Sequence, residues 1–477
     1  MIDHVQRALV QDLFHTGLSA ADPAQAVTAH LRLEQDTLFV GTRAYNLAGA
    51  RLVVIGAGKA TGTMAAATEA LLGERITAGW VNVRQGYDPG VPMRRIHVHV
   101  AGHPIPDEAS VAGTQQILDL LPGLEDDDLV LILLSGGASA LLELPVPGVG
   151  LEEVQRLTNV LLRSGATIAE VNTVRKHLSQ VKGGQLARWA GPAQVAVLVL
   201  SDVVGSPLDV IGSGPCAPDP TTYADAWDVL EHYGLVEALP VDVRAHLTRG
   251  RRGEVAETVK PGDPALARVV HTIIADNTVA AHAVVRRAQE LGYQALLLTT
   301  SLEGEAREVG RVLAALAKQV ACYDVLLTLG SLAQAEAASG DRFAGQGLAA
   351  NGAPLGWPAV LVCGGETTVT VRGPGRGGRN QELALAAALA LEGWPDILVA
   401  TLATDGTDGS TDAAGAIVTG DTASRARALG LNPAAHLVLN DSYPLFAALG
   451  DLIQTGPTGT NVNDLALLMV GDRAIKR

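Results

Sequence analysis

Residues 362–380 read Val-Cys-Gly-Gly-Glu-Thr-Thr-Val-Thr-Val-Arg-Gly-Pro-Gly-Arg-Gly-Gly-Arg-Asn. The alternating β-branched run 367–371 predicts a short strand, and the alanine- and leucine-rich run that starts at Gln381 predicts a helix. Between them lie several glycines together with Arg376 and Arg379. Glycine allows close backbone approach, a helix start offers unpaired N–H groups, and arginine binds phosphate or carboxylate through two parallel hydrogen bonds. The stretch therefore predicts an anion site on a strand–turn–helix unit. The alternative, a solvated arginine loop, accounts less well for so much glycine.

Length and composition predict a globular protein with two domains. A chain of 477 residues exceeds a single ordinary core. No apolar run reaches the roughly 18 residues of a membrane helix, and the first residues lack the basic-then-apolar order of a signal peptide. We therefore expect a cytoplasmic protein with no membrane partner. Three widely spaced cysteines fit neither a disulfide framework nor a zinc site, and a net charge of −15 argues against a nucleic-acid partner.

The stretch 51–60 predicts a buried strand, a tight turn and a helix, the opening of a doubly wound α/β unit. It is not a complete dinucleotide fingerprint, because Thr61 stands where the third glycine belongs and the next strand ends without the expected acid. It is not a Walker A motif either, since Lys59 is followed by alanine. What remains is Gly58 and Lys59 at a strand's carboxyl end, where such sheets bind ligands. A salt-bridged surface lysine is the alternative.

Two further stretches carry polar groups of the same kind. The apolar strand 128–134 leads into Ser135, Gly136, Gly137 and Ser139, a turn suited to phosphate or carboxylate, although serine is also a common helix cap. The stretch 172–187 reads as one helical segment. It places Arg175, Ser179 and Lys182 on one helix face, for which a solvated basic face is an equally good interpretation. His177 is left open between a structural and a functional role.

Aspartates follow two other apolar strands. After 195–200 come Asp202 and, within the next loop, Asp209. After 397–403 come Asp405 and Asp408, in an Asp-Gly-rich run. Carboxylates in these places could hold Mg²⁺ or accept a hydroxyl proton, but they could also cap helices or form ordinary turns.

A polar stretch from about 235 to 264 predicts the domain junction, which gives domains at 1–250 and 262–477. The strand at 271–275 and the helix after it are expected to open the second α/β region. The glycine- and alanine-rich stretch 335–354 is expected to be a mobile loop or lid. The polar run 455–464 predicts one more phosphate-sized loop.

Together these strand ends supply the two kinds of charge that phosphoryl transfer requires. Cations spread the charge of the moving phosphoryl group, and carboxylates hold Mg²⁺ or accept a proton. Because both halves of the chain contribute, we expect an active-site cleft between two α/β domains that close over an anionic substrate.

Six motifs along nearly the whole chain resemble the glycerate 2-kinase family, the class II kinases with a C-terminal MOFRL domain. They are Gly-Ala-Gly-Lys-Ala (56–60), Leu-Ser-Gly-Gly-Ala-Ser-Ala-Leu-Leu (134–142), Lys-His-Leu-Ser-Gln-Val-Lys-Gly-Gly-Gln-Leu-Ala (176–187), Ser-Asp-Val-Val-Gly-Ser-Pro-Leu-Asp-Val-Ile-Gly-Ser-Gly-Pro (201–215), Gly-Gly-Glu-Thr-Thr-Val-Thr-Val with Gly-Arg-Gly-Gly-Arg-Asn-Gln-Glu (364–371 and 375–382), and Ala-Thr-Asp-Gly-Thr-Asp-Gly-Ser-Thr-Asp (403–412). The chain departs from the family pattern in two places: Ser206 stands in place of an acidic residue, and the pair Ala275-Asp276 stands in place of Gly-Ser.

The resemblance implies a Rossmann-like N-terminal domain, a MOFRL domain, and phosphorylation of D-glycerate to 2-phosphoglycerate with ATP and Mg²⁺. It implies catalytic roles for Lys59 and Arg379, to which the residues add Asp405 and then Asp202 as proton acceptor or metal ligand. The metal candidates are Asp202, Asp405 and Asp408. The candidate substrate- and nucleotide-binding residues are Gly58, Ser135, Gly136, Gly137, Ser139, Arg175, Lys182, Asp209, Glu366, Arg376, Asn380 and Asp408. The oligomeric state is left open and admits a homodimer.

Two other functions remain alternatives at this point. Many members of the family have been labelled hydroxypyruvate reductases, and the glycine turn with Arg84 leaves an NAD(P)H-dependent reductase open. A non-catalytic protein that binds anions or sugar phosphates would also use serine-rich turns such as 135–139, but it would have no need of the carboxylates at 405–408.

Overall fold

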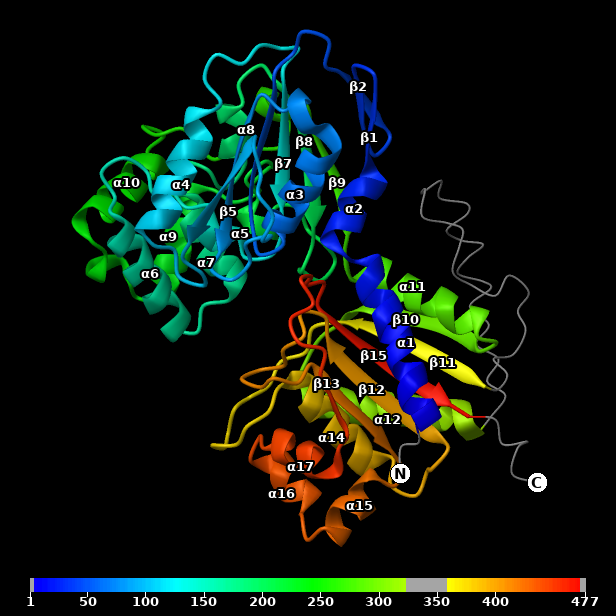
Figure 1. The fold of residues 1–477 in the computed structure, drawn as a ribbon. Helices are drawn as coiled ribbons and strands as arrows, with labels where there is room; N and C mark the ends of the chain where they lie inside the picture. Colours follow the sequence, from blue (N-terminus) through cyan, green and yellow to red (C-terminus); the bar gives the residue numbers. More distant parts are fainter. Residues whose placement is uncertain (1–3, 323–357, 472–477) are drawn as a thin grey trace, which may run out of the picture. The chain divides into compact units, whose positions relative to one another are not determined.

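The computed structural model describes residues 4–322 and 358–471, which divide into two compact units (Figure 1). The first unit is Asp22–Ala275; the second combines the N-terminal 21 residues with the chain from Asp276 onward. These limits differ from the expected ranges 1–250 and 262–477, because the first helix packs with the second half of the chain and the strand before Asp276 with the first half. The predicted loop or lid at 335–354 lies outside the described residues.

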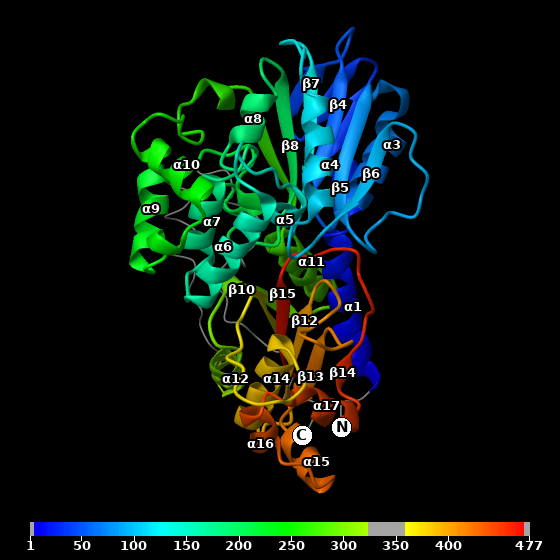
Figure 2. The same ribbon diagram turned by 90° about the vertical axis from the view of Figure 1, so that its left-hand side faces the viewer.

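The first unit is built on a parallel sheet of six strands with the spatial order β6-β5-β4-β7-β8-β9 (Figure 2). Its strands are β4 (Leu52–Ala57), β5 (Ala78–Arg84), β6 (Ile96–Ala101), β7 (Leu129–Leu134), β8 (Gln194–Leu200) and β9 (Val269–Ala275). Counted along the chain, this is the order 3-2-1-4-5-6 of doubly wound folds. All residues of β4 and β7 are buried, because helices cover both faces of the sheet, and this explains their continuous apolar sequences.

The helices of the first unit are α2 (Pro23–His30), α3 (Thr61–Leu72), α4 (Glu108–Asp119), α5 (Ala138–Leu141), α6 (Leu151–Arg163), α7 (Ile168–Lys176), α8 (Gln185–Trp189), α9 (Tyr223–His232) and α10 (Val241–Arg251). Helices α6, α7, α9 and α10 bury their apolar faces in a separate cluster that does not include the sheet. A small antiparallel meander, β1 (Leu31–Glu34), β2 (Thr37–Val40) and β3 (Arg43–Asn46), precedes β4.

The second unit has a mixed six-stranded sheet with the order β10-β11-β15-β12-β13-β14. The strands are β10 (Gln294–Leu302), β11 (Ala359–Gly365), β12 (Ile397–Ala403), β13 (Gly415–Thr419), β14 (Leu452–Ile453) and β15 (Asp464–Val470). Only β10 and β11 run parallel. The last strand, β15, lies antiparallel between β11 and β12. Its first residue therefore lies at the same sheet edge as the carboxyl ends of its two neighbours.

Helices cover both faces of this second sheet (Figure 1). They are α1 (His4–Ala20), α11 (Asn277–Glu290), α12 (Ala306–Cys322), α14 (Arg379–Ala390), α15 (Thr422–Ala428), α16 (Pro433–Val438) and α17 (Ser442–Leu449). Helices α12 and α14 share an apolar core with one face of β11, β12 and β15. On the other face, Gly17 of α1 lies against Val284 of α11 and Leu465 of β15. No helix within the described residues is long and apolar enough to cross a membrane.

Three expectations about local structure are wrong. The strand expected at 367–371 is extended chain that forms only a single bridge, between Thr368 and Glu305, because the buried strand lies earlier, at 359–365. The helical segment expected over 172–187 ends at Lys176, and two glycines with positive φ precede a second short helix. The strand at 269–275 completes the first sheet instead of opening the second.

Candidate active site

The carboxyl ends of β4 and β7 meet where the strand order of the first sheet reverses, which is where doubly wound sheets bind ligands. The Lys59 N–H donates to the carbonyl of Gly136 over 2.8 Å, and the Ala60 N–H donates to Oγ of Ser135 over 3.0 Å. Gly58 has a φ of +145°, and a β-carbon there would lie 2.1 Å from the Ser135 hydroxyl. Ser135 therefore joins the two turns and fixes the backbone of Lys59. Its hydroxyl has partners inside the protein rather than being reserved for a ligand.

The Lys59 side chain differs from the other lysines of the first unit in its partners. Lys176, Lys182 and Lys260 each form ion pairs with carboxylates. Within residues 4–322 and 358–471 the Lys59 ammonium has no hydrogen-bond or ion-pair partner. An unpaired, half-buried cation at the switch point of such a sheet is suited to an anionic ligand.

His103, which follows β6, also lies at this edge of the sheet and is not among the residues predicted from the sequence. A β-carbon on Gly137 would lie 2.9 Å from the His103 ring and 3.4 Å from the Lys59 side chain. Burial, and then the charges of Lys59 and Arg84, lower the pKa of His103 to about 4. The imidazole is therefore neutral near pH 7. Its Nδ1 atom is buried without a hydrogen-bond partner in the described residues.

Asp202 reaches the same two turns from the end of β8. A β-carbon on Gly136 would lie 1.9 Å from Oδ2 of Asp202, so only glycine allows this carboxylate to lie against the turn. Asp202 and the serine–glycine turn, two of the predicted site segments, therefore lie together in the structure.

The cations at 175 and 182 meet, although not on one helix as predicted. Lys182 is completely buried: its Nζ lies 3.0 Å from Glu143 Oε2 and donates to the Leu142 carbonyl over 2.7 Å. Arg175 lies 3.2 Å from the same carboxylate oxygen and donates to the Ser139 carbonyl over 2.7 Å. Burial, with a contribution from Arg175, lowers the pKa of Lys182 to about 8. In the structure both cations hold the chain that follows the 135–139 turn.

Ser139 itself is linked to the loop after β8. Its hydroxyl lies 2.8 Å from that of Ser213, which in turn donates to Asn172. Asp209 in the same loop lies 3.8 Å from Nζ of Lys176. These contacts tie the predicted binding turn to helix α7.

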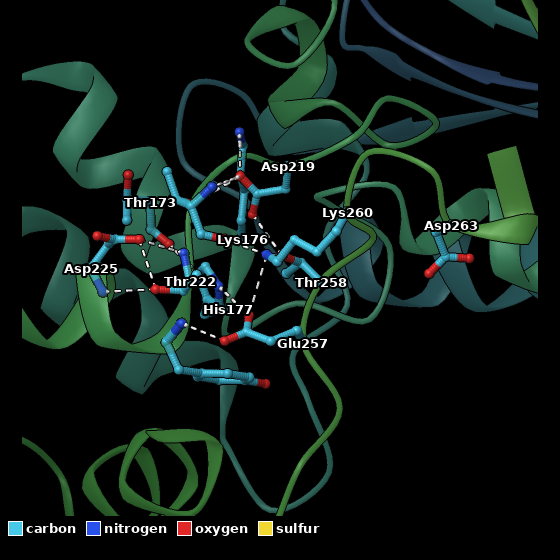
Figure 3. Close-up of polar contacts among 12 residues, drawn as sticks. Thr173, Lys176, His177, Asp219, Thr222, Asp225, Glu257, Thr258, Lys260 and Asp263 are labelled. Atoms are coloured by element: carbon cyan, nitrogen blue, oxygen red, sulfur yellow. Dashed lines mark hydrogen bonds and ion pairs between the residues drawn. The ribbon is translucent and has the colours of Figure 1, made fainter. Parts of the chain in front are cut away.

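Lys176 belongs to a buried polar network at the end of α7 (Figure 3). Its Nζ lies 3.3 Å from Oδ1 of Asp219, a carboxylate that also accepts hydrogen bonds from Thr221 and Thr258. Burial would raise the pKa of Asp219, but Lys176 and these hydrogen bonds outweigh it and lower the pKa below its usual value. Lys260 is bonded to Thr258 and paired with Glu257.

His177 lies in the same network and is buried. Its Nδ1 lies 2.8 Å from the Thr173 carbonyl, and its Nε2 lies 3.3 Å from Glu257. Because both ring nitrogens have protein partners, the structure favours the structural reading of His177 that the sequence left open.

In the second unit, Arg379 is the first residue of α14 and lies between two acids. Its Nε and Nη2 donate to Oδ2 and Oδ1 of Asp464 over 2.6 and 2.9 Å, and its Nη1 lies 2.8 Å from Oε1 of Glu366. Burial, together with the charges of Asp408 and Glu366, raises the pKa of Asp464 to about 7, although Arg379 acts in the opposite direction. From the sequence alone, Asp464 is only the last residue of the polar run 455–464 and has no assigned role.

Asp408 holds the start of α14. Its two oxygens accept the N–H groups of Asn380 and Gln381 over 3.1 and 2.9 Å, and it is 1% exposed. The helix N–H groups that the sequence predicts to bind an anionic ligand thus have a partner in the protein. A β-carbon on Gly378 would lie 2.3 Å from the Asp408 carboxyl carbon, so this glycine serves close approach to Asp408. Buried Asn380 also contacts Asp408, at 3.5 Å.

Arg376 and Asp405 lie on exposed or partly exposed loops of this unit. Arg376 stacks on the Tyr443 ring at 4.0 Å and lies 3.5 Å from Asp412, which accepts a hydrogen bond from the Tyr443 hydroxyl. Oδ1 of Asp405 accepts the N–H of Thr407 over 3.0 Å. Within the described chain no three His, Cys, Asp or Glu side chains gather as a metal site.

The structure adds one candidate site residue to each unit: His103 to the first and Asp464 to the second. The signal for Asp464 was a polar residue directly before an apolar strand. Such a residue joins the carboxyl ends of other strands only if its own strand runs antiparallel, which the sequence does not state. His103 follows strand β6, which is buried only at its first and last residues, and nothing in the neighbouring sequence distinguishes it from an ordinary loop histidine.

Comparisons with known proteins agree with this fold. Residues 9–248 match the family described as a domain of unknown function (DUF4147), and residues 359–464 match the MOFRL family. A glycerate 2-kinase of Pyrococcus horikoshii is 42% identical over 454 residues, 95% of this chain and 94% of its own. A protein of Agrobacterium vitis with a provisional hydroxypyruvate reductase name is 39% identical over 98% of this chain and 94% of its own. The crystal structure of a glycerate kinase from Thermotoga maritima has a TM-score of 0.83 at 41% identity, covering 98% of this chain and 100% of that one.

Proposed function

Because the chain belongs to the glycerate 2-kinase family, in which a MOFRL domain follows the N-terminal domain, we propose that it phosphorylates D-glycerate. The γ-phosphoryl group of ATP passes to the 2-hydroxyl and yields 2-phospho-D-glycerate and ADP. The observation that carries the proposal is the Lys59 ammonium, which lies without a protein partner in the described chain, at the switch point of a 3-2-1-4-5-6 sheet.

The chemistry assigns one role to each kind of charge. The oxygen of the glycerate 2-hydroxyl bonds to the γ-phosphorus, the bond from that phosphorus to the ADP oxygen breaks, and the hydroxyl proton passes to a carboxylate. Lys59 stabilises the negative charge of the phosphoryl group in flight. Arg379 binds an oxyanion, either the glycerate carboxylate or the phosphoryl group. Asp405 is our first candidate for the proton acceptor and Asp202 our second.

The proposal includes Mg²⁺, and the donor chemistry fits this ion in part. Kinases usually hold Mg²⁺ with one or two carboxylates plus substrate phosphates and waters, so a cage of three protein ligands is not required. Asp202 and Asp405 are partly exposed carboxylates and would each supply one ligand. Asp408 does not fit, because both of its oxygens accept N–H groups of α14. When bound, the ion neutralises charge on the ATP phosphates.

The remaining candidates for binding have supporting roles in this proposal. Ser135, Gly58, Gly136 and Gly137 shape the turns around Lys59. Arg175 and Lys182 hold the segment after Ser139, since both pair with Glu143. We propose a cytoplasmic location, which suits a chain whose three cysteines are all free.

Among the described residues, neither Thr61 nor Arg84 favours the reductase alternative. Thr61 is fully buried where the third glycine of a dinucleotide fingerprint would lie, and its hydroxyl lies 3.0 Å from Ser135. Arg84 is the residue that a reductase could use to bind the phosphate of NADP. Its guanidinium lies 5.6 Å from the Tyr87 ring centre.

The test is a ³¹P NMR spectrum of the purified protein with D-glycerate, ATP and Mg²⁺. A 2-phosphoglycerate resonance that grows as the γ-phosphate signal decreases is the expected result. A 3-phosphoglycerate resonance would keep the kinase and overturn the proposed site of phosphorylation. If no transfer occurs, and hydroxypyruvate instead oxidises NAD(P)H, the kinase proposal is wrong.

A further inference from the structure

The two acids that contact Arg379 are held in different ways. Asp464 binds the Nε and Nη2 side of the guanidinium, and its side chain is 11% exposed. It is the first residue of β15, opposite Gly365 of β11 and Ala403 of β12, and its carbonyl accepts a hydrogen bond from the Asn277 amide over 2.9 Å. This backbone cannot shift without breaking the ladder of the central strand.

Glu366 is held less firmly. It lies just beyond the end of β11, and its side chain is 40% exposed. Its Oε1 lies 2.8 Å from Nη1 of Arg379, and its Oε2 accepts the Asn463 amide over 2.7 Å. An ion pair this exposed contributes little to stability, so another anion can compete for the same nitrogen.

We propose that Asp464 is the positioning residue that turns Arg379 toward its ligand, and that Glu366 occupies the ligand's place on the guanidinium until an oxyanion displaces it. This inference rests on the proposed function and adds two roles to it. The Asp464 fork leaves the Nη1 end of the guanidinium as the part that a carboxylate or phosphoryl oxygen can bind. Glu366 presents the same chemistry, a carboxylate, at that end.

The two roles predict opposite kinetic effects. In the E366Q variant the competing charge is gone, so kcat/KM should rise roughly two- to fivefold, the strength of an exposed ion pair. In the D464N variant the guanidinium loses its fixed orientation, and kcat/KM should fall by about 10²-fold. An effect on the KM for glycerate would identify the oxyanion as the glycerate carboxylate, and an effect on kcat would identify it as the transferred phosphoryl group.

Matched controls separate these effects from general damage. Asp451 is a buried aspartate that pairs with Arg425 in the same unit, and Glu392 is an exposed glutamate that pairs with Arg427. D451N and E392Q should leave kcat/KM within about twofold of wild type. Thermal melting of all four variants shows which of them keep the fold. E366Q changes a partly exposed side chain, so it still tests the proposal if D464N does not fold.

Three results would overturn the inference. A fall of kcat/KM in E366Q would make Glu366 a direct ligand contact. An unchanged kcat/KM in E366Q would show that Glu366 does not compete with the ligand for Arg379. A folded D464N that behaves like D451N would leave Asp464 without a positioning role. If wild type transfers no phosphoryl group, the proposed function fails instead, and calorimetric titration of the same variants with D-glycerate and with ATP still measures whether the two substitutions have opposite signs.

Discussion

Among single residues, Lys59 combines a half-buried position with an ammonium that no other described residue holds. Replacing it by alanine therefore removes no protein contact of that group and leaves the backbone turn, which is held by Ser135 and Gly136, in place. We expect kcat of K59A to fall at least about 10²-fold, since removing such a charge stabiliser typically costs this much. The melting temperature should change little.

The matched control is K318A, because Lys318 lies in a helix of the other unit with its ammonium 5.5 Å from the Trp394 ring centre. Steady-state kinetics of both variants are measured with D-glycerate and ATP. If K59A kept turnover within about threefold of wild type, the catalytic role of Lys59 would be wrong.

A second prediction at this scale concerns pH. Burial, with Asp408 and Glu366, raises the pKa of Asp464 to about 7, while Arg379 acts in the opposite direction; within the described residues these two acids and Arg379 are the charged groups with the largest effect on it. A neutral carboxyl holds the guanidinium less well than a carboxylate, so kcat/KM should fall as pH falls through about 7. In E366Q one of the charges that raise the pKa is removed, and the midpoint should move to lower pH. A pH–rate profile whose acid limb is identical in both proteins would contradict this assignment.

At the scale of elements, the start of α14 depends on Asp408. The D408A substitution leaves two helix N–H groups without their acceptor in a buried place, and we expect the free energy of unfolding to fall by about 2 kcal/mol. Denaturant unfolding measures this. The control, D412A, removes an aspartate whose side chain is 64% exposed and should cost less than about 1 kcal/mol. Equal losses in the two variants would show that the cap does not hold the helix.

Continuous apolar runs and the turns after them could be predicted from the sequence because burial on both faces of a sheet leaves a local pattern. This applies to β4, β7, β8 and β12, and to the helix after Gly378. The extended run 367–371 has the composition of a strand without being one. β-Branched residues favour an extended backbone, but a strand also needs a partner edge, and only Thr368 finds one.

Individual residues of the candidate site can be predicted from the sequence because they follow such local patterns. The residues that each of them contacts cannot be predicted in this way. Lys59, Asp202 and Arg379 stand beside strand ends or glycine turns that can be read in the sequence. Which acid meets which base depends on strand direction and on contacts across long separations, as with Arg379 and Asp464, 85 positions apart. The sequence predicts that the glycines near Arg379 let the backbone approach a ligand, but three of them lie against the protein's own chain: Gly373 and Gly375 against Leu439, and Gly378 against Asp408.

At the scale of the whole molecule, the limits of the first unit can be tested directly. A fragment of residues 22–275 contains all six strands of the parallel sheet, whereas 1–250 lacks β9 and leaves the buried strand β8 at an edge. We expect the first fragment to be monomeric and to melt cooperatively, and the second to aggregate, because an apolar unpaired edge pairs with other chains. Size-exclusion chromatography and circular dichroism compare the two. Equal behaviour would mean that β9 is dispensable for folding of the unit.

Because β15 lies in the middle of the second sheet, its late position in the sequence determines which parts of the protein can fold while the chain is still being synthesised. Helix α1 emerges before the other described helices and strands, yet its neighbours α11 and β15 belong to the second half, and β15 is the last of the described strands. A nascent chain can complete the parallel sheet before β15 has been synthesised. Until then, β11 and β12 lack the strand that pairs with both of them, and α1 lacks its contact with that strand. Any polypeptide cut short before residue 464 lacks both this strand and the acid that turns Arg379. Premature termination would therefore release a chain with a finished first unit and no assembled arginine site.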